Sequence, residues 1–315
     1  MNFNQLKYFI ELERYKSFSE AAKTLGITQP ALSLQIQKLE EEYEFQLIDR
    51  TKKPLALTAE GELFYEKALE IVQLVGDLDQ LSLDMENQVE GKLRVGIIPT
   101  LSPYLVPLFF DELNHRFPAL KVNIMELKTE EILSMLAHND LDLGIISTPV
   151  KAPKIGIVPL FYEQFYLYIS PKHPLGTTES VDLKQINETE LLYLYEGNCF
   201  QNQVNSVCQM SGLSESELSF RYLSNSIESL KRIVENQGGL TFIPELASSN
   251  IPAEYEPMVK KIEAPVPIRE ISACYLKTTG YKKTARIFVD VLLESIPSRM
   301  KQKPSEKILN TEIRF

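Results

Sequence analysis

The feature that most constrains the fold of this chain is a long apolar seam close to its N-terminal end. Seven residues recur at alternating spacings of four and three: Phe64, Ala68, Ile71, Val75, Leu78, Ser82 and Met85. This a/d pattern predicts one long helix, which Thr58 can cap and which ends near Val89. A single helix cannot bury such a seam alone, so we predict a homodimer through residues 59–90. The alternative is that the seam packs on its own domain.

Residues 1–58, ahead of the seam, are predicted to form short helices. Ser17 and Glu20 fit a capping box at the start of the second helix, and Gly26 suits the left-handed turn that ends it. Thr28 is a candidate N-cap for the next helix. The apolar face of that helix consists of Leu32, Ile36 and Leu39. Two helices joined by a tight glycine-containing turn predict a helix-turn-helix.

The other face of this third helix carries short polar side chains near its start, as a helix that reads the major groove requires. Thr28, Gln29 and Ser33 supply them, and Gln29 could pair with adenine through two hydrogen bonds. Arg50 and Lys52 lie in a small basic cluster that could hold phosphates. From the residues alone, a helical hairpin used only for packing remains the alternative.

The charge balance neither requires nor forbids contact with nucleic acid. The net charge is −10, yet residues 1–60 hold 8 of the 33 basic and 9 of the 43 acidic residues, which is nearly neutral. The acidic excess therefore lies outside the predicted DNA-binding domain. Hydrophobic residues make up 44% of the chain and charged residues 24%, which excludes a wholly disordered chain.

Targeting and metal signals are weak. Because the first residues lack the apolar core of a signal peptide and no apolar run could span a membrane, we expect a cytoplasmic protein without membrane attachment. The three cysteines are too few for a disulfide framework in a reducing compartment. The three histidines are scattered and suggest no metal cluster, and we expect no cofactor.

The rest of the chain alternates predicted strands and helices, which favours a parallel sheet with crossover helices. Its length suggests a two-lobed α/β domain over residues 91–296. Lobe I is expected at about 91–163 and 268–296, and lobe II at about 164–267. Ligands in such folds bind at the carboxyl ends of strands. The expected strands are 92–98, 121–127, 141–146, 165–169, 191–195, 240–243 and 269–275, and the expected helices are 104–117, 129–138 and 282–293. Residues 297–315 are polar and are expected to be a mobile tail.

Two cysteines in lobe II are nine residues apart. Residues 197–208 read GNCFQNQVNSVC, which predicts a turn followed by a helix that runs through Cys208. Nine helical steps separate Cys199 and Cys208 by about 13.5 Å along the axis, whereas a disulfide needs Cα atoms within about 6.8 Å. A bond between them would have to remodel the helix, which is how a thiol pair can act as a switch. The alternative is that both are small buried apolar residues.

The N-terminal residues also carry a family resemblance. Residues 17–33 read SFSEAAKTLGITQPALS, and QIQKLE, LIDR and LTAEG begin at Gln35, Leu47 and Leu57. This pattern resembles the N-terminal signature of LysR-type transcriptional regulators. The resemblance covers residues 1 to about 296. It implies a winged helix-turn-helix, a linker-helix dimer, often a homotetramer, and a two-lobed effector domain like periplasmic binding proteins.

The resemblance also implies residue roles at the DNA and in transcription. One residue departs from the pattern, because Leu34 stands where many members have a basic residue, although it could contact a thymine methyl. Implied partners are double-stranded promoter DNA and RNA polymerase. The implied DNA-binding residues are Thr28, Gln29, Pro30, Ser33, Leu34, Gln35, Lys38, Arg50 and Lys52.

Within the LysR family, the cysteine pair resembles that of hydrogen-peroxide-sensing members. This resemblance implies that Cys199 reacts with peroxide, that Cys208 then forms a disulfide with it, and that thioredoxin- or glutaredoxin-type reductants restore the thiols. It places Thr100 and Thr129 as hydroxyl partners of peroxide and Arg269 as a nearby cation. The alternatives are that the threonines cap helices and that Arg269 makes a surface ion pair.

Asn198 departs from the histidine that these members commonly carry before the sensor cysteine, while Cys274 is expected in a strand core. We therefore expect a redox-sensing transcriptional regulator of the oxidative stress response rather than an enzyme. One alternative is a LysR-type regulator that binds a small carboxylate in the cleft near Thr100. The other, from a different class, is a thiol peroxidase.

Overall fold

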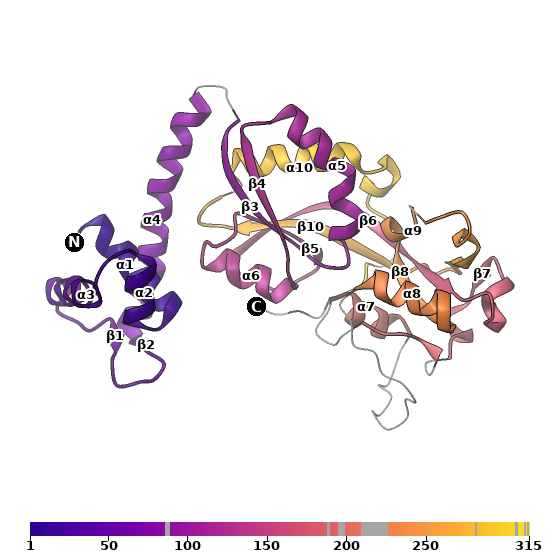
Figure 1. Ribbon diagram of the computed structural model, residues 1–315, viewed down its shortest axis with the longest axis horizontal. Helices are drawn as coiled ribbons and strands as arrows, with labels where there is room; N and C mark the ends of the chain where they lie inside the picture. Colours follow the sequence, from indigo (N-terminus) through magenta and orange to yellow (C-terminus); the bar gives the residue numbers. More distant parts are fainter. Residues whose placement is uncertain are drawn as a thin grey trace. The chain divides into compact units, whose positions relative to one another are not determined.

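The computed structural model of the chain describes residues 1–85, 89–187, 190–194, 199–208, 226–249, 251–280, 282–305, 308–311, 313 and 315. The chain forms two compact units, Met1–Gln88 and Val89–Phe315 (Figure 1). The first unit contains both the predicted helix-turn-helix and the long helix that follows it.

The N-terminal unit is a winged helix-turn-helix. Its elements are α1 (Phe3–Tyr15), α2 (Phe18–Thr24), α3 (Gln29–Tyr43), β1 (Ile48–Asp49), β2 (Ala56–Leu57) and α4 (Ala59–Met85). Strands β1 and β2 pair antiparallel and form the wing. The apolar faces of the helices meet in one core, which includes Leu6, Phe9, Leu32, Ile36 and Leu39.

Polar caps fix the ends of these helices as the sequence predicts. The Thr28 hydroxyl accepts from the Ala31 amide at 3.4 Å, and Gly26 has a φ of +67° in the turn between α2 and α3. The Ser17 hydroxyl likewise accepts from the first turn of α2. Because each cap satisfies a backbone donor that the helix leaves unpaired, short helices can end sharply. The two helices of the motif are thereby held by local sequence.

The second unit contains a two-lobed α/β domain. Its strands are β3 (Gly91–Ile97), β4 (Leu120–Glu126), β5 (Leu143–Thr148), β6 (Ile155–Ile169), β7 (Ser180–Val181), β8 (Leu240–Pro244), β9 (Val259–Ile262) and β10 (Ile268–Leu276). Its α-helices are α5 (Ser102–Arg116), α6 (Thr129–Ala137), α7 (Cys199–Cys208), α8 (Ile227–Gln237), α9 (Glu245–Ser248) and α10 (Lys283–Ser295). Short 3₁₀ turns lie at Pro174–Thr177, Leu183–Gln185, Glu256–Met258 and Ser298–Lys301.

The strands form one mixed sheet in the order β4-β3-β5-β10-β6-β9-β7, with β8 also paired to β6. The predicted parallel pairing holds for β3 with β4 and with β5, but β10 runs antiparallel to both β5 and β6. The chain enters lobe II along β6 and returns to lobe I along β10, so these two strands must run in opposite directions. The expected wholly parallel sheet is wrong at this point.

Each lobe has its own apolar core around this shared sheet. Phe109 and Phe288 lie in the lobe I core, while Phe165 and Phe242 lie in the lobe II core. Strand β6 contributes Phe161 to the first core and Phe165 to the second, so the predicted boundary at 163/164 falls within one continuous strand. In lobe I, α5 and α10 lie on one side of the strands and α6 on the other (Figure 1).

Two expectations about local structure are wrong. The described part of the strand expected at 191–195 holds only bridge residues, at Leu191, which pairs with Leu240, and at Leu194. The expected mobile tail is instead packed where the structure describes it, because it carries buried apolar side chains: Met300 and Ile313 belong to the lobe I core. Within the described ranges, no helix is both long enough and apolar enough to cross a membrane.

Candidate functional site

The first candidate site is the exposed face of α3. Thr28, Gln29 and Pro30 at its start are exposed to solvent, and the Ser19 hydroxyl donates to the Gln29 side chain at 3.2 Å. Leu34 is 50% exposed despite being apolar. Of the other predicted DNA-binding residues of this helix, Lys38 is exposed, whereas Ser33 and Gln35 are half-buried. The exposed face of α3 therefore combines polar side chains with the apolar side chain of Leu34.

The wing carries the basic residues, but one of them already has a structural partner. Arg50 donates to Glu40 at 2.9 Å, and the other carboxylate oxygen of Glu40 accepts the Leu47 amide. Arg50 therefore ties the wing to the end of α3. Lys52 is 3.9 Å from Asp49 and is 63% exposed, so it is the freer of the two cations.

The predicted seam of α4 divides into two parts. Phe64 and Ala68 pack against the core of the N-terminal unit, so the first part of the seam is used within the chain. Ile71 is 39% exposed and Leu74 is 59% exposed. The side chains of the last members, Leu78, Ser82 and Met85, lie outside the described residues. An apolar surface therefore remains on α4 where the domain core ends.

The second candidate site lies in lobe II. Helix α7 begins at Cys199 and ends at Cys208, so the two cysteines are the first and last residues of one helix, as the sequence predicts. The side chains of both cysteines lie outside the described residues, and Asn198 lies outside them altogether. Ten helical residues hold the two Cα positions about 13.5 Å apart.

Arg269 is not a surface residue, contrary to one alternative from the sequence. It is fully buried and forms an ion pair with Glu163, which is also fully buried, at 2.6 Å. Its guanidinium also donates to the Thr100 hydroxyl at 3.0 Å. Sequence reasoning missed Glu163, because a carboxylate 106 residues away in an adjacent strand leaves no local signal. We call Arg269, Glu163 and Thr100 the Arg269 cluster.

One aromatic residue connects the Arg269 cluster to α7. The Phe200 ring stacks on Phe165 with centroids 4.9 Å apart, and the Arg269 guanidinium lies 5.2 Å from the Phe200 centroid. Because Phe200 directly follows Cys199 in the chain, a movement at the start of α7 would act on Arg269. The buried Glu163 carboxylate balances the charge of Arg269, and the N-terminus of α7, where Cys199 lies, is a second positive feature of this region.

A polar contact in the middle of α7 reaches lobe I. Gln203 is fully buried, and its side chain donates to the Ser147 hydroxyl in β5 at 3.2 Å. Thr129, the remaining predicted hydroxyl partner, is buried at the start of α6. The structure therefore brings Thr100 and Arg269 into contact with each other, and places Thr129 on a separate helix.

Cys274 lies in β10 and is buried, as expected. Burial raises the pKa of its thiol well above the ordinary value. A thiol that stays protonated reacts slowly with oxidants. Cys274 is therefore an internal control for the reactivity of the other two cysteines.

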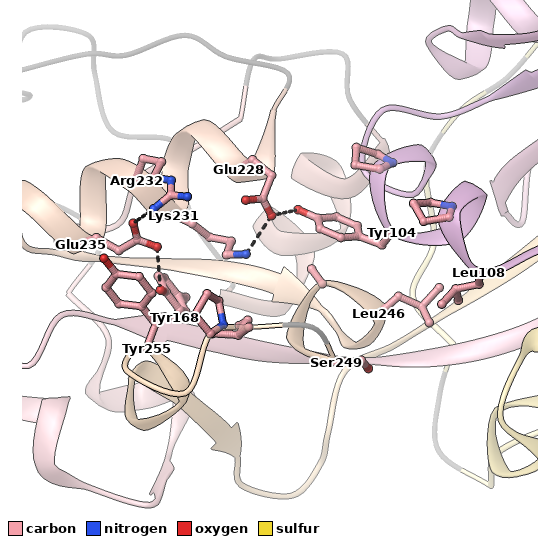
Figure 2. A pocket seen from close by; sticks show the side chains of 15 residues that line it. Tyr104, Leu108, Tyr168, Glu228, Lys231, Arg232, Glu235, Leu246, Ser249 and Tyr255 are labelled. Atoms are coloured by element: carbon pink, nitrogen blue, oxygen red, sulfur yellow. Dashed lines mark hydrogen bonds and ion pairs between the residues drawn. The ribbon is translucent and has the colours of Figure 1, made fainter. Parts of the chain in front are cut away.

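A cavity of about 680 Å³ lies between α5 and α8 (Figure 2). At its edge, the Tyr104 hydroxyl and the Lys231 ammonium both donate to one oxygen of Glu228, each at 2.8 Å. Burial and the Glu228 charge raise the pKa of Tyr104. Desolvation works to raise the pKa of Glu228, but the hydrogen bonds from Lys231 and Tyr104 outweigh it and lower that pKa. The apolar residues Leu108 and Leu246 also line the cavity.

Models of two protein domains match the chain. Residues 3–62 match the bacterial regulatory helix-turn-helix protein of the lysR family, and residues 86–297 match the LysR substrate binding domain. The first match covers the N-terminal unit up to the start of α4, and the second covers most of the other unit.

Individual proteins give a narrower comparison. The chain is 32% identical to the DNA-binding transcriptional dual regulator OxyR of Escherichia coli over 307 residues, which is 95% of this chain and 96% of that protein. It is 32% identical to a hydrogen peroxide-inducible genes activator of Haemophilus influenzae, over 87% of this chain and 90% of the relative. These relatives are transcriptional regulators rather than enzymes.

Solved structures agree with the sequence comparison. A full-length OxyR variant from Pseudomonas aeruginosa superimposes with a TM-score of 0.73 at 27% identity, covering 94% of this chain and 97% of that one. OxyR from Porphyromonas gingivalis gives a TM-score of 0.65 at 28% identity, covering 70% of this chain and all of that one.

Proposed function

This chain belongs to the LysR family of bacterial helix-turn-helix transcriptional regulators, and from that premise we propose that it is a peroxide-responsive regulator switched by Cys199 and Cys208. The observation that carries the proposal is the position of the two cysteines at opposite ends of α7. A disulfide between them is incompatible with that helix. The similarity to hydrogen peroxide-inducible genes activators indicates hydrogen peroxide as the oxidant.

The chemistry proceeds in two balanced steps. The Cys199 thiolate attacks one oxygen of hydrogen peroxide, the O–O bond breaks, and hydroxide leaves as Cys199 becomes a sulfenic acid. The Cys208 thiol then attacks the sulfenic sulfur, and water leaves as the disulfide forms. Two thiols and one peroxide thus give one disulfide and two waters. Thioredoxin- or glutaredoxin-type dithiols of the cytoplasm reverse the change by thiol–disulfide exchange.

Activation of Cys199 rests on its place in the fold. As the first residue of α7, it lies at the positive end of the helix, where a thiolate is stabilised. We propose that the peroxide oxygens bind to Thr100, Thr129 and Asn198. Arg269 acts on the start of α7 through its contact with Phe200, the residue after Cys199. Asn198 can donate a hydrogen bond to peroxide, but it cannot gain or lose a proton as histidine can.

The response is read out through promoter DNA. We propose that Thr28, Gln29 and Ser33 read base edges in the major groove while Lys52 contacts phosphates. Exposed Ile71 and Leu74 pair α4 with a second copy, which would match the two-fold symmetry of an operator. Refolding of α7 shifts the paired DNA-binding units within a homotetramer, and this changes their contact with RNA polymerase.

The test compares DNA footprints of reduced and peroxide-treated full-length protein on the DNA upstream of its own gene. We expect the footprint of the wild type to change on oxidation and that of Cys199→Ser to stay in its reduced form. Cys274→Ser is the matched control and should respond as the wild type does, because that thiol is buried in β10. Mass spectrometry should find Cys199 linked to Cys208 after near-stoichiometric peroxide. A changed footprint with these two cysteines unlinked would refute the redox mechanism.

The cavity beside Tyr104 favours a second candidate function, a regulator that responds to a small carboxylate. Its volume lies in the range of ordinary ligand sites, and Arg232 at its lining is exposed enough to meet an anion. A panel of small carboxylates should then raise the thermal midpoint of the wild type but not that of Arg232→Ala. No shift with any of them would leave the peroxide response as the better account.

A further inference from the structure

We infer that the C-terminal residues 308–315 form a strap that α7 holds in place only while α7 is helical. The strap would thus be part of the switch rather than an inert tail. The inference rests on the proposed function, because it takes the Cys199–Cys208 disulfide as the event that dismantles α7. The described residues of the strap are 308–311, 313 and 315.

The strap starts beside β10 and ends in lobe I. Ile308 forms a parallel bridge with Ile268, and the Leu309 amide donates to the Ile268 carbonyl at 2.9 Å. Further along, the Lys151 amide donates to the Ile313 carbonyl at 3.1 Å, and the Phe315 amide donates to the Lys151 carbonyl at 2.8 Å. Main-chain hydrogen bonds therefore anchor both ends of the strap, next to Arg269 at one end and just after β5 at the other.

Side chains of the strap are buried in both lobes. Leu309 packs against the lobe II core, while Ile313 is 7% exposed within the lobe I core. Between them, Thr311 is fully buried, and its hydroxyl donates to the Pro149 carbonyl. A segment with apolar anchors in two cores restrains the movement of one lobe against the other.

Helix α7 holds the middle of the strap through two side-chain amides. Asn202 donates to the Thr311 carbonyl at 3.1 Å, and Gln203 donates to the Leu309 carbonyl at 3.3 Å. Both donors lie between Cys199 and Cys208 in the sequence. They are the link through which the state of the helix acts on the strap.

Oxidation would remove both donors together. The disulfide must bring Cα atoms about 13.5 Å apart to within about 6.8 Å, so the backbone that carries Asn202 and Gln203 cannot keep its helical path. The carbonyls of Leu309 and Thr311 then lose their partners, which is unfavourable where they are screened from water. The strap is therefore expected to detach from α7 when the disulfide forms.

The same coupling works in the other direction. If helical α7 holds the strap, the strap stabilises helical α7 and so opposes disulfide formation. Each neutral hydrogen bond of this kind changes an equilibrium constant about three- to tenfold. Removal of the strap should therefore favour the disulfide about tenfold, which corresponds to a midpoint potential about 30 mV more negative.

The experiment measures the Cys199–Cys208 equilibrium of the full-length protein in glutathione buffers of defined ratio. A stop codon at Ile308 removes the whole strap and should raise the disulfide equilibrium constant about tenfold. Asn202→Ala and Thr311→Val should each raise the disulfide equilibrium constant about threefold. These two variants provide the test if the truncated chain fails to fold. Asn205→Ala is the control, because Asn205 is exposed on the same helix and accepts a bond from Gln201 within α7 rather than from the strap. Water can replace a partner at an exposed site, so this variant should raise the equilibrium constant clearly less than Asn202→Ala does.

Hydrogen exchange supplies a readout that a merely stabilising tail would not give. The amides of Leu309, Lys151 and Phe315 should be protected in the reduced protein and lose protection when the disulfide forms. If the disulfide forms while these amides stay protected, the strap inference is wrong and the proposed function stands.

A wild type that forms no disulfide would refute the proposed function separately. The contact between the strap and α7 would then be tested by hydrogen exchange of the reduced protein alone. The α7 amides should exchange several-fold faster in Asn202→Ala than in Asn205→Ala, and equal rates in these two variants would overturn it.

Discussion

Two groups of contacts next to α7 differ in chemistry. The Arg269 cluster is charged and fully buried, whereas the contact of α7 with the strap consists of neutral hydrogen bonds. Breaking a buried ion pair leaves an uncompensated charge, which is far more costly than losing a neutral hydrogen bond. The Arg269 cluster is thus suited to stay closed, and we call it the fixed joint. The contact of α7 with the strap can break at lower cost, and we call it the joint that can open. A switch needs both, because a movable part must move against something that stays in place.

The largest effect should come from removing one partner of the fixed joint. Glu163→Gln leaves the Arg269 charge buried without its counter-ion, and we expect a loss of about 3–5 kcal/mol in the free energy of unfolding by urea. The control is Glu179→Gln, an exposed carboxylate in the same unit, which should change stability by less than about 0.5 kcal/mol. A loss below about 1 kcal/mol for Glu163→Gln would mean that the two contacts do not differ as argued.

The next largest loss of stability should come from changing Phe200, which belongs to α7 and lies against Arg269. Phe200→Ala removes a ring that stacks on Phe165 and lies against Arg269, and a loss of about 3 kcal/mol is expected in the reduced protein. Phe200→Leu keeps part of the volume and should lose about 1 kcal/mol. Urea titrations of both variants in the reduced and oxidised forms measure the effect, which should be smaller after oxidation because α7 is then rebuilt. Equal losses in both forms would show that Phe200 belongs to the fixed joint alone.

A partly exposed ion cluster in lobe I shows what solvent access does to a charged contact. Asp142 binds Arg94 at 3.0 Å and Lys282 at 3.1 Å. Desolvation works to raise the pKa of Asp142, but the hydrogen bonds and charges of Arg94 and Lys282 outweigh it and lower that pKa. The stabilisation is therefore complete above the unfolded-state pKa of about 3.9 and disappears as the pH falls through the lower folded-state pKa.

Asp142→Asn should accordingly lose about 1–2 kcal/mol at pH 7. The difference from the wild type should shrink at pH 3, when both are unfolded by urea. Asp111→Asn, which changes an exposed carboxylate on α5, should show no such convergence. A difference that is constant between pH 7 and pH 3 would contradict the assigned direction of the pKa shift.

The smallest effect should come from the hydrogen bond that anchors the strap to Pro149. Thr311→Val removes the hydroxyl that donates to the Pro149 carbonyl and should lower stability by about 1 kcal/mol. Thr311→Ser keeps the hydroxyl and should retain most of that bond. Thermal unfolding of the two reduced variants measures the difference. If the Thr311→Val variant is at least as stable as the Thr311→Ser variant, packing rather than the hydrogen bond holds the strap.

The sequence was most informative where structure depends on nearby residues. The caps at Thr28 and Thr58, the turn at Gly26 and the helix between the two cysteines all follow from local spacing. The Glu163 partner of Arg269 did not, because pairing across strands depends on a register that no short window of sequence contains. The packing of the C-terminal residues was missed for another reason: Met300, Leu309 and Ile313 are diluted among polar residues, so composition alone suggested a mobile end.

Strand β6 supplies side chains to both cores, and β10 runs beside it for most of its length. The two lobes are therefore connected by continuous strands rather than by a flexible linker. A signal that starts at α7 can pass between the lobes through this two-stranded ribbon, and a twisted ribbon responds to force by changing its twist. This connection favours a small rotation of one lobe against the other over a wide separation of the two.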